Sequence, residues 1–438
     1  MQKILKYCLV LFFISTLACN KDEEPANALQ PVISTVWPLE GNAATIVTIR
    51  GKHFSGIRTE NTVKFNGVEA VVIEATTGQL QVVSPEDGST GPITIAVRNM
   101  EISGPVFTYS APSEEYTVKV FAGDVTAGSV DGPATVARFK SPEGVAIDAA
   151  GNLIVTDRGN NRIRRITPDG VVSPIAGATT AGFANGPATD ARFRLPWRST
   201  VDKAGNIYVA DRDNHCIRKI AADGTVSTLA GSGTAGFADG SKDAAMFNQP
   251  LDVAVDDAGN VFVADNLNHR IRKITPDGQV STLAGDGTAG YADGNGTSAR
   301  LKNPSGLTMD TAGNLLVADR LNHRIRKVSM AGEVSTVAGD GTTGYRDGDA
   351  AAARFADPYG ITVDSKGNIL VADLNNNKVR KLSSGTVSTV AGSGKGFLDG
   401  DGAAAQLNQP TDVCTDAAGN IYVADLGNNC IRKISLLK

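Results

Sequence analysis

The sequence lacks a long apolar run, a basic excess and a paired set of cysteines, and each absence excludes a class of protein. No stretch reaches the roughly 18–20 apolar residues that a membrane-spanning helix needs. The 438 residues include 42 basic and 46 acidic side chains, which give a net charge of −4. A nucleic-acid partner is therefore not expected, because such proteins carry a basic stripe. Only five cysteines are present, too few for a disulfide scaffold.

Glycine, by contrast, is abundant, with 48 residues that recur in Asn-Gly, Asp-Gly and Gly-Asn pairs. These pairs are turn signals, and their number predicts many short strands. Hydrophobic residues make up 41% of the chain and charged residues 20%, as in a chain that folds. The composition therefore predicts an all-β protein.

The first residues predict export. Lys3 and Lys6 precede an apolar stretch from Tyr7 to Ala18, which has the length of a signal-peptide core. The stretch ends in Thr16-Leu17-Ala18-Cys19, which resembles a bacterial lipobox, although Thr16 stands where such motifs usually carry Leu. We predict a signal peptide over 1–18, lipidation of Cys19 and an acidic tether over 19–29. The alternative is an ordinary secretory signal with an incidental cysteine.

The acidic tract 20–25 resembles the export tag of lipoproteins displayed on gram-negative cells. That resemblance implies an outer-membrane, surface-exposed location through the Cys19 anchor. Cys8 would leave with the signal peptide, so Cys216, Cys414 and Cys430 would remain. An odd number cannot pair completely within the chain, and we expect these three as small buried residues.

Residues 30–110 contain short β-rich runs separated by turns. Asn66-Gly67 lies between two such runs and predicts a hairpin. Several strands within about eighty residues predict a β-sandwich. The stretches at 37–41, 49–54 and 63–67, with Thr90-Gly91-Pro92-Ile93, resemble the IPT/TIG family of immunoglobulin-like domains. In secreted bacterial proteins, this resemblance implies a spacer.

From residue 116 to 438 one unit repeats six times. Its phrase Gly-Asn-Xaa-Xaa-Val-(Ala/Thr)-Asp recurs in steps of 54, 54, 54, 54 and 52 residues. Each unit holds four β-rich segments, for example 253–255, 261–264, 271–274 and 280–284. Six such units predict a six-bladed β-propeller. The sixth unit lacks its last segment, and Val118–Gly123 supplies that segment before the first unit. We therefore predict that the N-terminal strand pairs with the last blade and closes the ring.

The segments Phe247–Pro250, Val261–Asp265 and Asn268–Arg272 resemble the NHL repeat, and all six units match. Residues present in every unit are interpreted as scaffold. They are six aspartates, Asp157, Asp211, Asp265, Asp319, Asp373 and Asp425, and six arginines, Arg164, Arg218, Arg272, Arg326, Arg380 and Arg432. His215, His269 and His323 share a position that Asn fills in other units, which disfavours a metal site. No metal and no cofactor is expected.

Residues that change from unit to unit are the candidate ligand contacts, and they belong to two positions. The pair after each loop proline is expected to ring the channel mouth, and the residue after each repeated aspartate lies nearby. The candidate residues are Glu143, Trp197, Arg198, Asp252, Tyr359, Asp412, Arg158, Arg212 and Arg320. Trp197 has two interpretations: an exposed ring for sugar stacking or a protein partner, or a plug in the channel. Glu143, Asp252 and Asp412 are alternatively a calcium or acid–base site.

These residues predict a lipid-anchored surface protein whose propeller is a non-catalytic binding module. The expected partner is an extracellular polysaccharide or an envelope protein. The first alternative is a lyase or lactonase that acts at the channel mouth. The second is a structural adhesion or assembly module.

Overall fold

The computed structural model describes residues 30–109 and 114–437, which form two compact units divided after Ser113. Both units are built from strands and short 3₁₀ turns, which confirms the predicted all-β class. The predicted signal peptide, Cys19 and the tether lie outside the described residues. Within the described part, no helix has the length and apolar character to cross a membrane.

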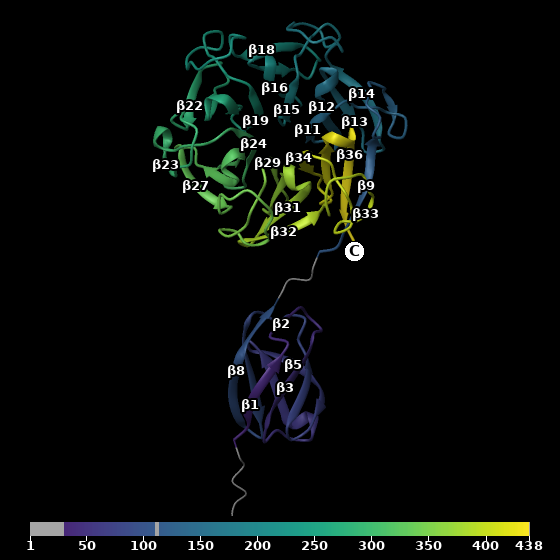
Figure 1. Ribbon diagram of the computed structural model, residues 1–438, viewed down its shortest axis with the longest axis vertical. Coiled ribbons are helices and arrows are strands. Elements are labelled where there is room, and N and C mark those ends of the chain that lie inside the picture. Colours follow the sequence, from purple (N-terminus) through teal and green to yellow (C-terminus); the bar gives the residue numbers. More distant parts are fainter. Residues whose placement is uncertain (1–29, 110–113, 438) are drawn as a thin grey trace, which may run out of the picture. The chain divides into compact units, whose positions relative to one another are not determined.

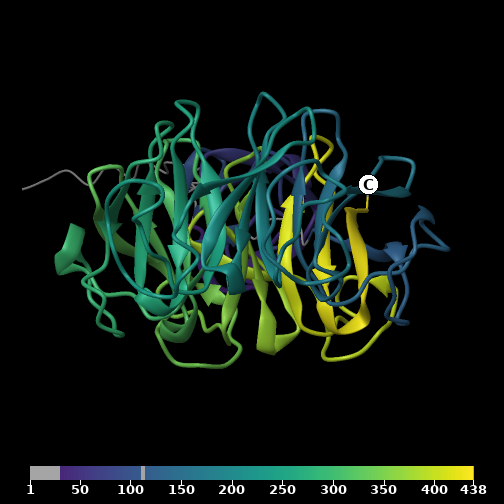
Figure 2. The ribbon, with the colours of Figure 1, turned by 90° about the horizontal axis from the view of Figure 1, so that it is seen from above.

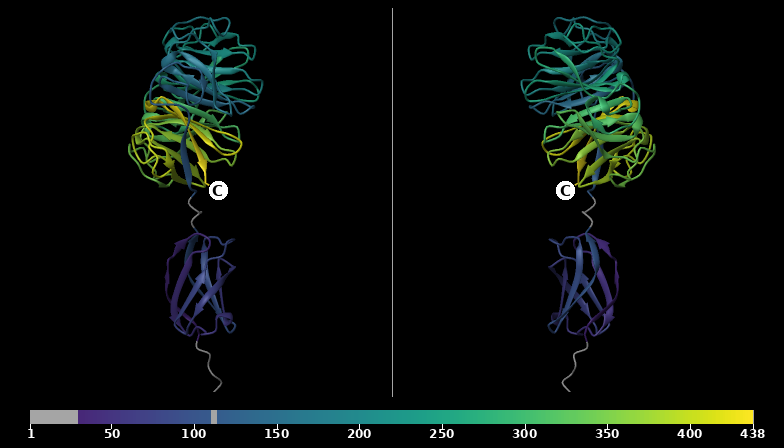
Figure 3. Two further views of the ribbon diagram at one scale, coloured as in Figure 1. Left: turned by 90° about the vertical axis from the view of Figure 1, so that its right-hand side faces the viewer. Right: turned by 90° about the vertical axis from the view of Figure 1, so that its left-hand side faces the viewer.

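The N-terminal unit is an immunoglobulin-like sheet of eight strands in the order β1-β3-β6-β5-β4-β7-β8-β2. Its elements are β1 (Val32–Trp37), β2 (Glu40–Gly41), β3 (Ile46–Lys52), η1 (Arg58–Glu60), β4 (Asn61–Phe65), β5 (Val68–Ala75), β6 (Gln79–Val83), β7 (Gly91–Val97) and β8 (Met100–Tyr109). Side views show the strands in two facing layers (Figure 3). Alternate residues such as Val47, Ile49 and Phe65 point inward and form its core.

The predicted hairpin at Asn66-Gly67 is present. β4 pairs with β5 in antiparallel fashion, and Asn66 and Gly67 have φ values of 45° and 87°. Asn and Gly adopt this left-handed backbone most readily, so the dipeptide fixes the turn.

The C-terminal unit is a ring of six antiparallel sheets, as Figure 1 shows, and it confirms the predicted six-bladed propeller. Seen from above in Figure 2, the blade strands cross the thickness of the ring. The innermost strands are β11 (Pro142–Ile147), β15 (Pro196–Val201), β19 (Pro250–Val255), β24 (Pro304–Met309), β29 (Pro358–Val363) and β34 (Pro410–Thr415).

The remaining strands run outward within each blade. The second strands are β12 (Leu153–Asp157), β16 (Ile207–Asp211), β20 (Val261–Asp265), β25 (Leu315–Asp319), β30 (Ile369–Asp373) and β35 (Ile421–Asp425). The third strands are β13 (Arg162–Ile166), β17 (Cys216–Ile220), β21 (Arg270–Ile274), β26 (Arg324–Val328), β31 (Lys378–Ser383) and β36 (Cys430–Leu436). The fourth strands are β14 (Val171–Ala176), β18 (Val226–Ala230), β22 (Val280–Ala284), β27 (Glu333–Ala338), β32 (Thr386–Ala391) and β9 (Tyr116–Gly123).

Four blades carry a fifth, two-residue strand that the sequence analysis did not predict. These strands are β10 (Gly132–Pro133), β23 (Gly294–Asn295), β28 (Gly348–Asp349) and β33 (Gly400–Asp401). Each comes from the long loop between blades and pairs with the outermost strand. The loops thereby cover the outer edge of the blade, which a propeller must protect.

A 3₁₀ turn follows the second strand of every blade, and a further one lies in the loop of the fourth blade. They are η2 (Arg158–Asn160), η3 (Arg212–Asn214), η4 (Asn266–Asn268), η5 (Gly296–Ser298), η6 (Arg320–Asn322), η7 (Leu374–Asn376) and η8 (Leu426–Asn428).

The ring closes as predicted. β9 pairs with β36 in antiparallel fashion from Cys430↔Gly123 to Leu436↔Tyr116. In Figure 1 these strands, blue and yellow, lie side by side in one blade. The first strand of the propeller is therefore the outer strand of its last blade.

Candidate functional site

The repeated aspartate and arginine of each blade form a buried ion pair. In the third blade, Asp265 Oδ1 accepts the backbone N–H of Asn248 at 2.8 Å, and Oδ2 accepts from Asn268 and Arg272, both at 2.8 Å. Arg272 also donates to the backbone oxygens of Met246 and Ala238. Both side chains are fully buried. The pair ties the turn after the second strand to the preceding loop.

The same ion pair occurs in the other five blades, with Nη1–Oδ2 distances from 2.7 to 3.0 Å. Burial raises the pKa of these aspartates, for example of Asp211 to about 6. The scaffold interpretation of both repeated positions is confirmed. Cys216, Cys414 and Cys430 are also buried and unpaired within the described residues, as expected.

The shared His and Asn position joins neighbouring blades. His269 has φ 55°, and its Nδ1 accepts the backbone N–H of Asn303 in the next blade at 3.2 Å. Asn161 occupies the same position with φ 54°, and its Oδ1 accepts the N–H of Leu195 at 3.0 Å. Both residue types supply an acceptor at the same point, so they are interchangeable here. The histidines are therefore links between blades, and burial lowers the pKa of His269.

The candidate residues after the loop prolines begin the six innermost strands, where the strands crowd around the ring axis. Trp197 on β15 is only 7% exposed. Its Nε1 donates to the hydroxyl of Tyr359 on β29 at 2.9 Å. The guanidinium groups of Arg158 and Arg212 lie over its ring, 4.7 and 4.4 Å from the ring centre. Of the two interpretations of Trp197, the structure therefore supports a plug in the channel. The interpretation as an exposed ring for stacking is wrong, because the two arginines already cover the ring.

Arg198 crosses the axis next to Trp197 and is fully buried. Its Nη1 lies 3.6 Å from Asp252 Oδ2, and its Nε lies 3.5 Å from Asp412 Oδ1. It donates to the backbone oxygens of Tyr359 and Thr411, and its guanidinium lies over the Tyr359 ring at 4.5 Å. One side chain of the second blade thus contacts the third, fifth and sixth blades.

Asp252 and Asp412 link blades as well as balancing the charge of Arg198. Asp252 Oδ2 accepts the N–H of Leu307 at 2.9 Å, and Asp412 Oδ2 accepts the N–H of Val145 at 2.9 Å. Burial raises the pKa of both carboxyl groups. The two carboxylates meet at Arg198, whereas Glu143 lies on the Arg158 side of the plug. Across the described residues, no three His, Cys, Asp or Glu side chains are grouped as metal ligands.

Glu143 is a buried carboxylate with one ionic neighbour. Its Oε2 lies 3.0 Å from Arg158 Nη1, but neither oxygen accepts a hydrogen bond from the described residues. Burial raises its pKa to about 7 and outweighs the attraction of Arg158 and Arg198. Burial therefore favours the protonated form of this carboxyl group.

Three arginines form the solvent-facing rim above this plug. Arg158, Arg212 and Arg320 start the turns η2, η3 and η6, and their side chains are 24%, 22% and 30% exposed. Arg212 pairs with Asp213 at 3.0 Å, and Arg320 pairs with Asp357 at 3.4 Å. Arg320 also lies over the Tyr359 ring at 5.1 Å. The sequence-predicted residues thus meet in one cluster, with a polar rim and a buried floor.

The second half of the channel is hollow. A cavity of about 270 Å³ follows the later residues of the six innermost strands, and Asp252 and Asp412 reach it from the plug. Threonines such as Thr308 and Thr362 line its wall. The plug therefore separates this cavity from the arginine rim.

The sequence contains a further signal for the plug. Glycines occupy the position of Arg198 in three other blades, as Gly144, Gly306 and Gly360. A Cβ at Gly306 would clash with the Tyr359 backbone, and one at Gly360 with Asp412. Large residues in some blades and glycines in others indicate that one axial space is shared.

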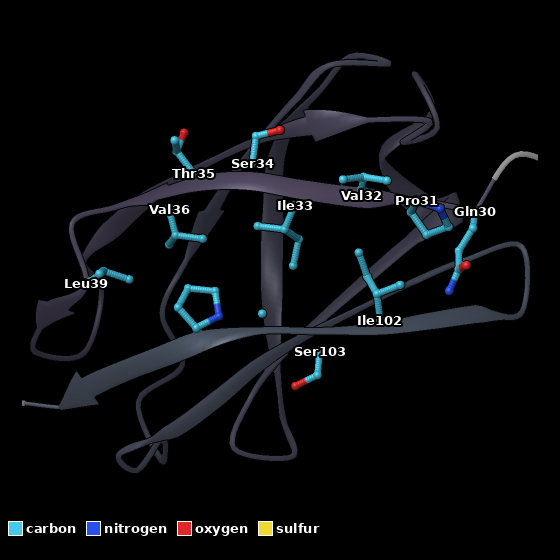
Figure 4. Close-up of a pocket in the computed structure, with 12 residues that line it drawn as sticks. Gln30, Pro31, Val32, Ile33, Ser34, Thr35, Val36, Leu39, Ile102 and Ser103 are labelled. Carbon is cyan, nitrogen blue, oxygen red and sulfur yellow. The ribbon is translucent and has the colours of Figure 1, made fainter.

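The N-terminal domain has a hollow of its own, of about 670 Å³, between β1 and β8 (Figure 4). Ile33, Val36, Leu39 and Ile102 line it. The sequence pattern predicts neither this hollow nor the 76% exposure of Trp37 at the end of β1.

The fold defines an all-β protein in which an immunoglobulin-like domain precedes a six-bladed β-propeller. The IPT/TIG domain family matches residues 31–113. The NHL repeat family matches 139–166, 193–220, 247–274, 301–328, 355–382 and 407–434. The chain therefore carries an IPT/TIG domain followed by an NHL-repeat propeller, as the resemblances implied.

Individual relatives match about two thirds of the chain. The chain is 31% identical over 323 residues to Protein SUPPRESSOR OF QUENCHING 1, chloroplastic, of Arabidopsis thaliana, across 68% of this chain and 31% of the relative. It is 29% identical over 347 residues to NHL repeat-containing protein 2 of Bos taurus, across 67% of this chain and 46% of the relative. The chain thus spans less than half the length of these curated relatives.

Among solved structures, an auxiliary nutrient binding protein from Bacteroides ovatus is similar with a TM-score of 0.57 and 18% identity. The similarity covers 93% of this chain and 98% of that one. At 18% identity, this similarity shows that the two proteins share a fold over most of both chains.

Proposed function

We propose that this protein is a non-catalytic binding protein whose propeller captures an extracellular polysaccharide at the arginine rim. The observation that carries the proposal is the cluster itself. Three part-exposed arginines from three blades meet over a rigid floor of Trp197 and Tyr359. Preorganised donors on a rigid floor are typical of a ligand site. The name of the similar Bacteroides ovatus protein, a nutrient binding protein, supports the same class.

The charges at the rim favour a neutral ligand. Arg158, Arg212 and Arg320 each have a carboxylate neighbour, Glu143, Asp213 and Asp357 respectively. These neighbours offset part of the positive charge of the arginines, so the rim offers guanidinium donors with a small net charge. Hydroxyl groups of a polysaccharide can accept such hydrogen bonds without the strong attraction that a polyanion needs.

The enzymatic alternative, a lyase or lactonase, has less support. Glu143 is buried below the arginine rim. Asp252 and Asp412 reach the cavity on the other side of the plug, but both lie against Arg198 and accept backbone N–H groups of neighbouring inner strands. A general acid or base at the channel mouth must reach its substrate within hydrogen-bond distance, and all three carboxylates are buried.

The test is binding of the purified protein to soluble neutral glucans, xylans and mannans in native gels that contain the polymer. Arg212→Ala is expected to weaken binding about tenfold, because hydrogen bonds to charged groups contribute about 1.5–3 kcal/mol. Arg165→Ala is the matched control, since Arg165 is exposed on β13 away from the rim. If the polysaccharide retards Arg212→Ala and wild type equally in the gel, the proposed site is contradicted. If the protein binds no polysaccharide but binds an envelope protein, the protein-partner alternative is supported.

We also propose that the protein is held at the outer membrane, exposed to the exterior, through a lipidated Cys19. The lipobox-like sequence and the acidic tract after it support this location. Labelling with radioactive palmitate is expected in wild type and absent in Cys19→Ser. Protease treatment of intact cells tests exposure, because a protein that faces the periplasm would survive it.

A further inference from the structure

The outer face of the N-terminal sheet carries the exposed tryptophan of this chain. Trp37 stands at the end of β1, and its cross-strand partner Thr48 on β3 pairs in turn with Gln81 on β6. Directly opposed residues of paired strands point to the same side of a sheet. Val36, Val47 and Val82, their neighbours in sequence, are buried in the core. Trp37, Thr48 and Gln81 therefore share the outward side.

Two further rows of side chains flank this row. On one side, Arg50 pairs with Thr35 and Gln79, and its Nε donates to Gln79 Oε1 at 3.3 Å. On the other side, Ile46 pairs with Val83, which pairs with Val71. Trp37, Ile46 and Val71 are all exposed. The face thus combines one indole ring, a polar row and an aliphatic row.

From this arrangement we infer that the outer face of β1, β3, β6 and β5 is a second binding site, and that its ligand is a neutral polysaccharide. A pyranose ring has an apolar C–H face that packs on an indole and a hydroxyl rim that bonds to amide and hydroxyl groups. Trp37 offers the first, and Thr48, Gln79 and Gln81 offer the second. The ligand class is that of the proposed function, but the site lies on the other domain.

The polarity and charge of the face select a polysaccharide over a protein. The core of a protein interface is depleted of charged residues. Here the row of Trp37 continues through Thr48 and Gln81 to Glu74, and the next row holds Arg50. One cation and one anion leave these three rows without net charge, so the face attracts no charged polymer. Four strands spaced about 4.8 Å apart span about 14 Å, enough for several sugar units.

The test uses the whole protein and two readouts. The first is affinity in native gels that contain soluble glucan, xylan or mannan. Trp37→Ala is expected to weaken binding about tenfold, and Gln81→Ala less. The control is Ile57→Ala, because Ile57 is exposed outside the three rows. Thermal denaturation checks that each variant keeps its fold.

The second readout is tryptophan fluorescence, because the chain has only two tryptophans. Acrylamide is expected to quench Trp37 and not the buried Trp197, and saturating polysaccharide is expected to protect Trp37. The proposal is overturned if no polymer binds, if bound polymer leaves the quenching unchanged, or if Trp37→Ala binds like wild type.

The two proposals fail separately. If only Arg212→Ala weakens binding, the site at the propeller rim is supported and the site at Trp37 is overturned. If only Trp37→Ala weakens binding, the site at Trp37 is supported and the site at the rim is overturned. Trp37-dependent capture of a protein with no polysaccharide binding would also overturn the ligand class.

Discussion

The propeller buries the carboxylate of Glu143 without supplying it with a hydrogen-bond donor from the described residues. Its pKa rises to about 7 in the folded protein, against an ordinary value of 4.5. Between these two values the native state binds more protons than the unfolded state. The free energy of unfolding therefore falls as pH rises from about 4.5 to 7.

Glu143→Gln is expected to remove this part of the pH dependence. At pH 8 the variant should be more stable than wild type by about 1–3 kcal/mol, because the buried charge of Glu143 is removed. Near pH 4.5 the two should differ little. Urea denaturation at both pH values measures this. Asp213→Asn, on the part-exposed partner of Arg212, is the control, and an equal response of both variants would contradict the argument.

Arg198 lies between the carboxylates of Asp252 and Asp412, which also accept backbone N–H groups of neighbouring blades. Arg198→Met should destabilise the propeller by about 3–5 kcal/mol at pH 8, because Asp252 and Asp412 lose their shared cation. The loss should be smaller at pH 5, where raised pKa values let both carboxylates take up protons. Chemical denaturation of the variant against Arg212→Ala measures the difference. An equal loss at both pH values would show that packing, not charge, dominates.

Among the elements, the turn after each second strand is the joint between blades. Its His or Asn has a left-handed backbone and accepts a backbone N–H of the next blade. His269→Asn should change stability by less than about 0.5 kcal/mol, because Asn161 performs the same task. His269→Ala should lower it by about 1–3 kcal/mol, since the Asn303 N–H loses its acceptor.

Hydrogen exchange reports on the same joint. The Asn303 amide should exchange faster in His269→Ala and at the wild-type rate in His269→Asn. Equal exchange in all three proteins would mean that the bond carries no stability.

The elements could be predicted from sequence because their causes are local and repeated. Strand periodicity, the Asn66-Gly67 turn and the six aspartates each depend on neighbours a few residues away. The floor of the site could not be predicted in this way. Trp197 and Tyr359 are 162 residues apart in the chain, and they come into contact only because β15 and β29 both lie next to the ring axis. The exposure of Trp37 likewise depends on which face of β1 the core takes. The sequence contains two tryptophans, and tertiary packing decides that Trp37 faces solvent and Trp197 does not.

At the scale of the whole molecule, one strand pairing decides whether the propeller is a ring or an open array. β9 and β36 exchange backbone hydrogen bonds along seven residue pairs, although more than three hundred residues separate them. Asn429 adds a side-chain link, because its Oδ1 accepts the N–H of Ser141 in the first blade at 2.9 Å. Loss of β9 would expose the edge of β36 and the buried core between the last and first blades.

Two truncated chains separate this closure from any contribution of the N-terminal domain. A chain of residues 114–438 keeps β9 and should unfold cooperatively, with Cys216, Cys414 and Cys430 protected from thiol reagents. A chain of residues 124–438 lacks β9, and its Cys430 should react readily because Gly123 no longer pairs with it. A peptide of residues 114–123 added in trans should restore protection, since it supplies the missing strand. If both chains melt alike and protect Cys430 equally, the strand pairing does not hold the ring together, and the arginine rim does not depend on closure.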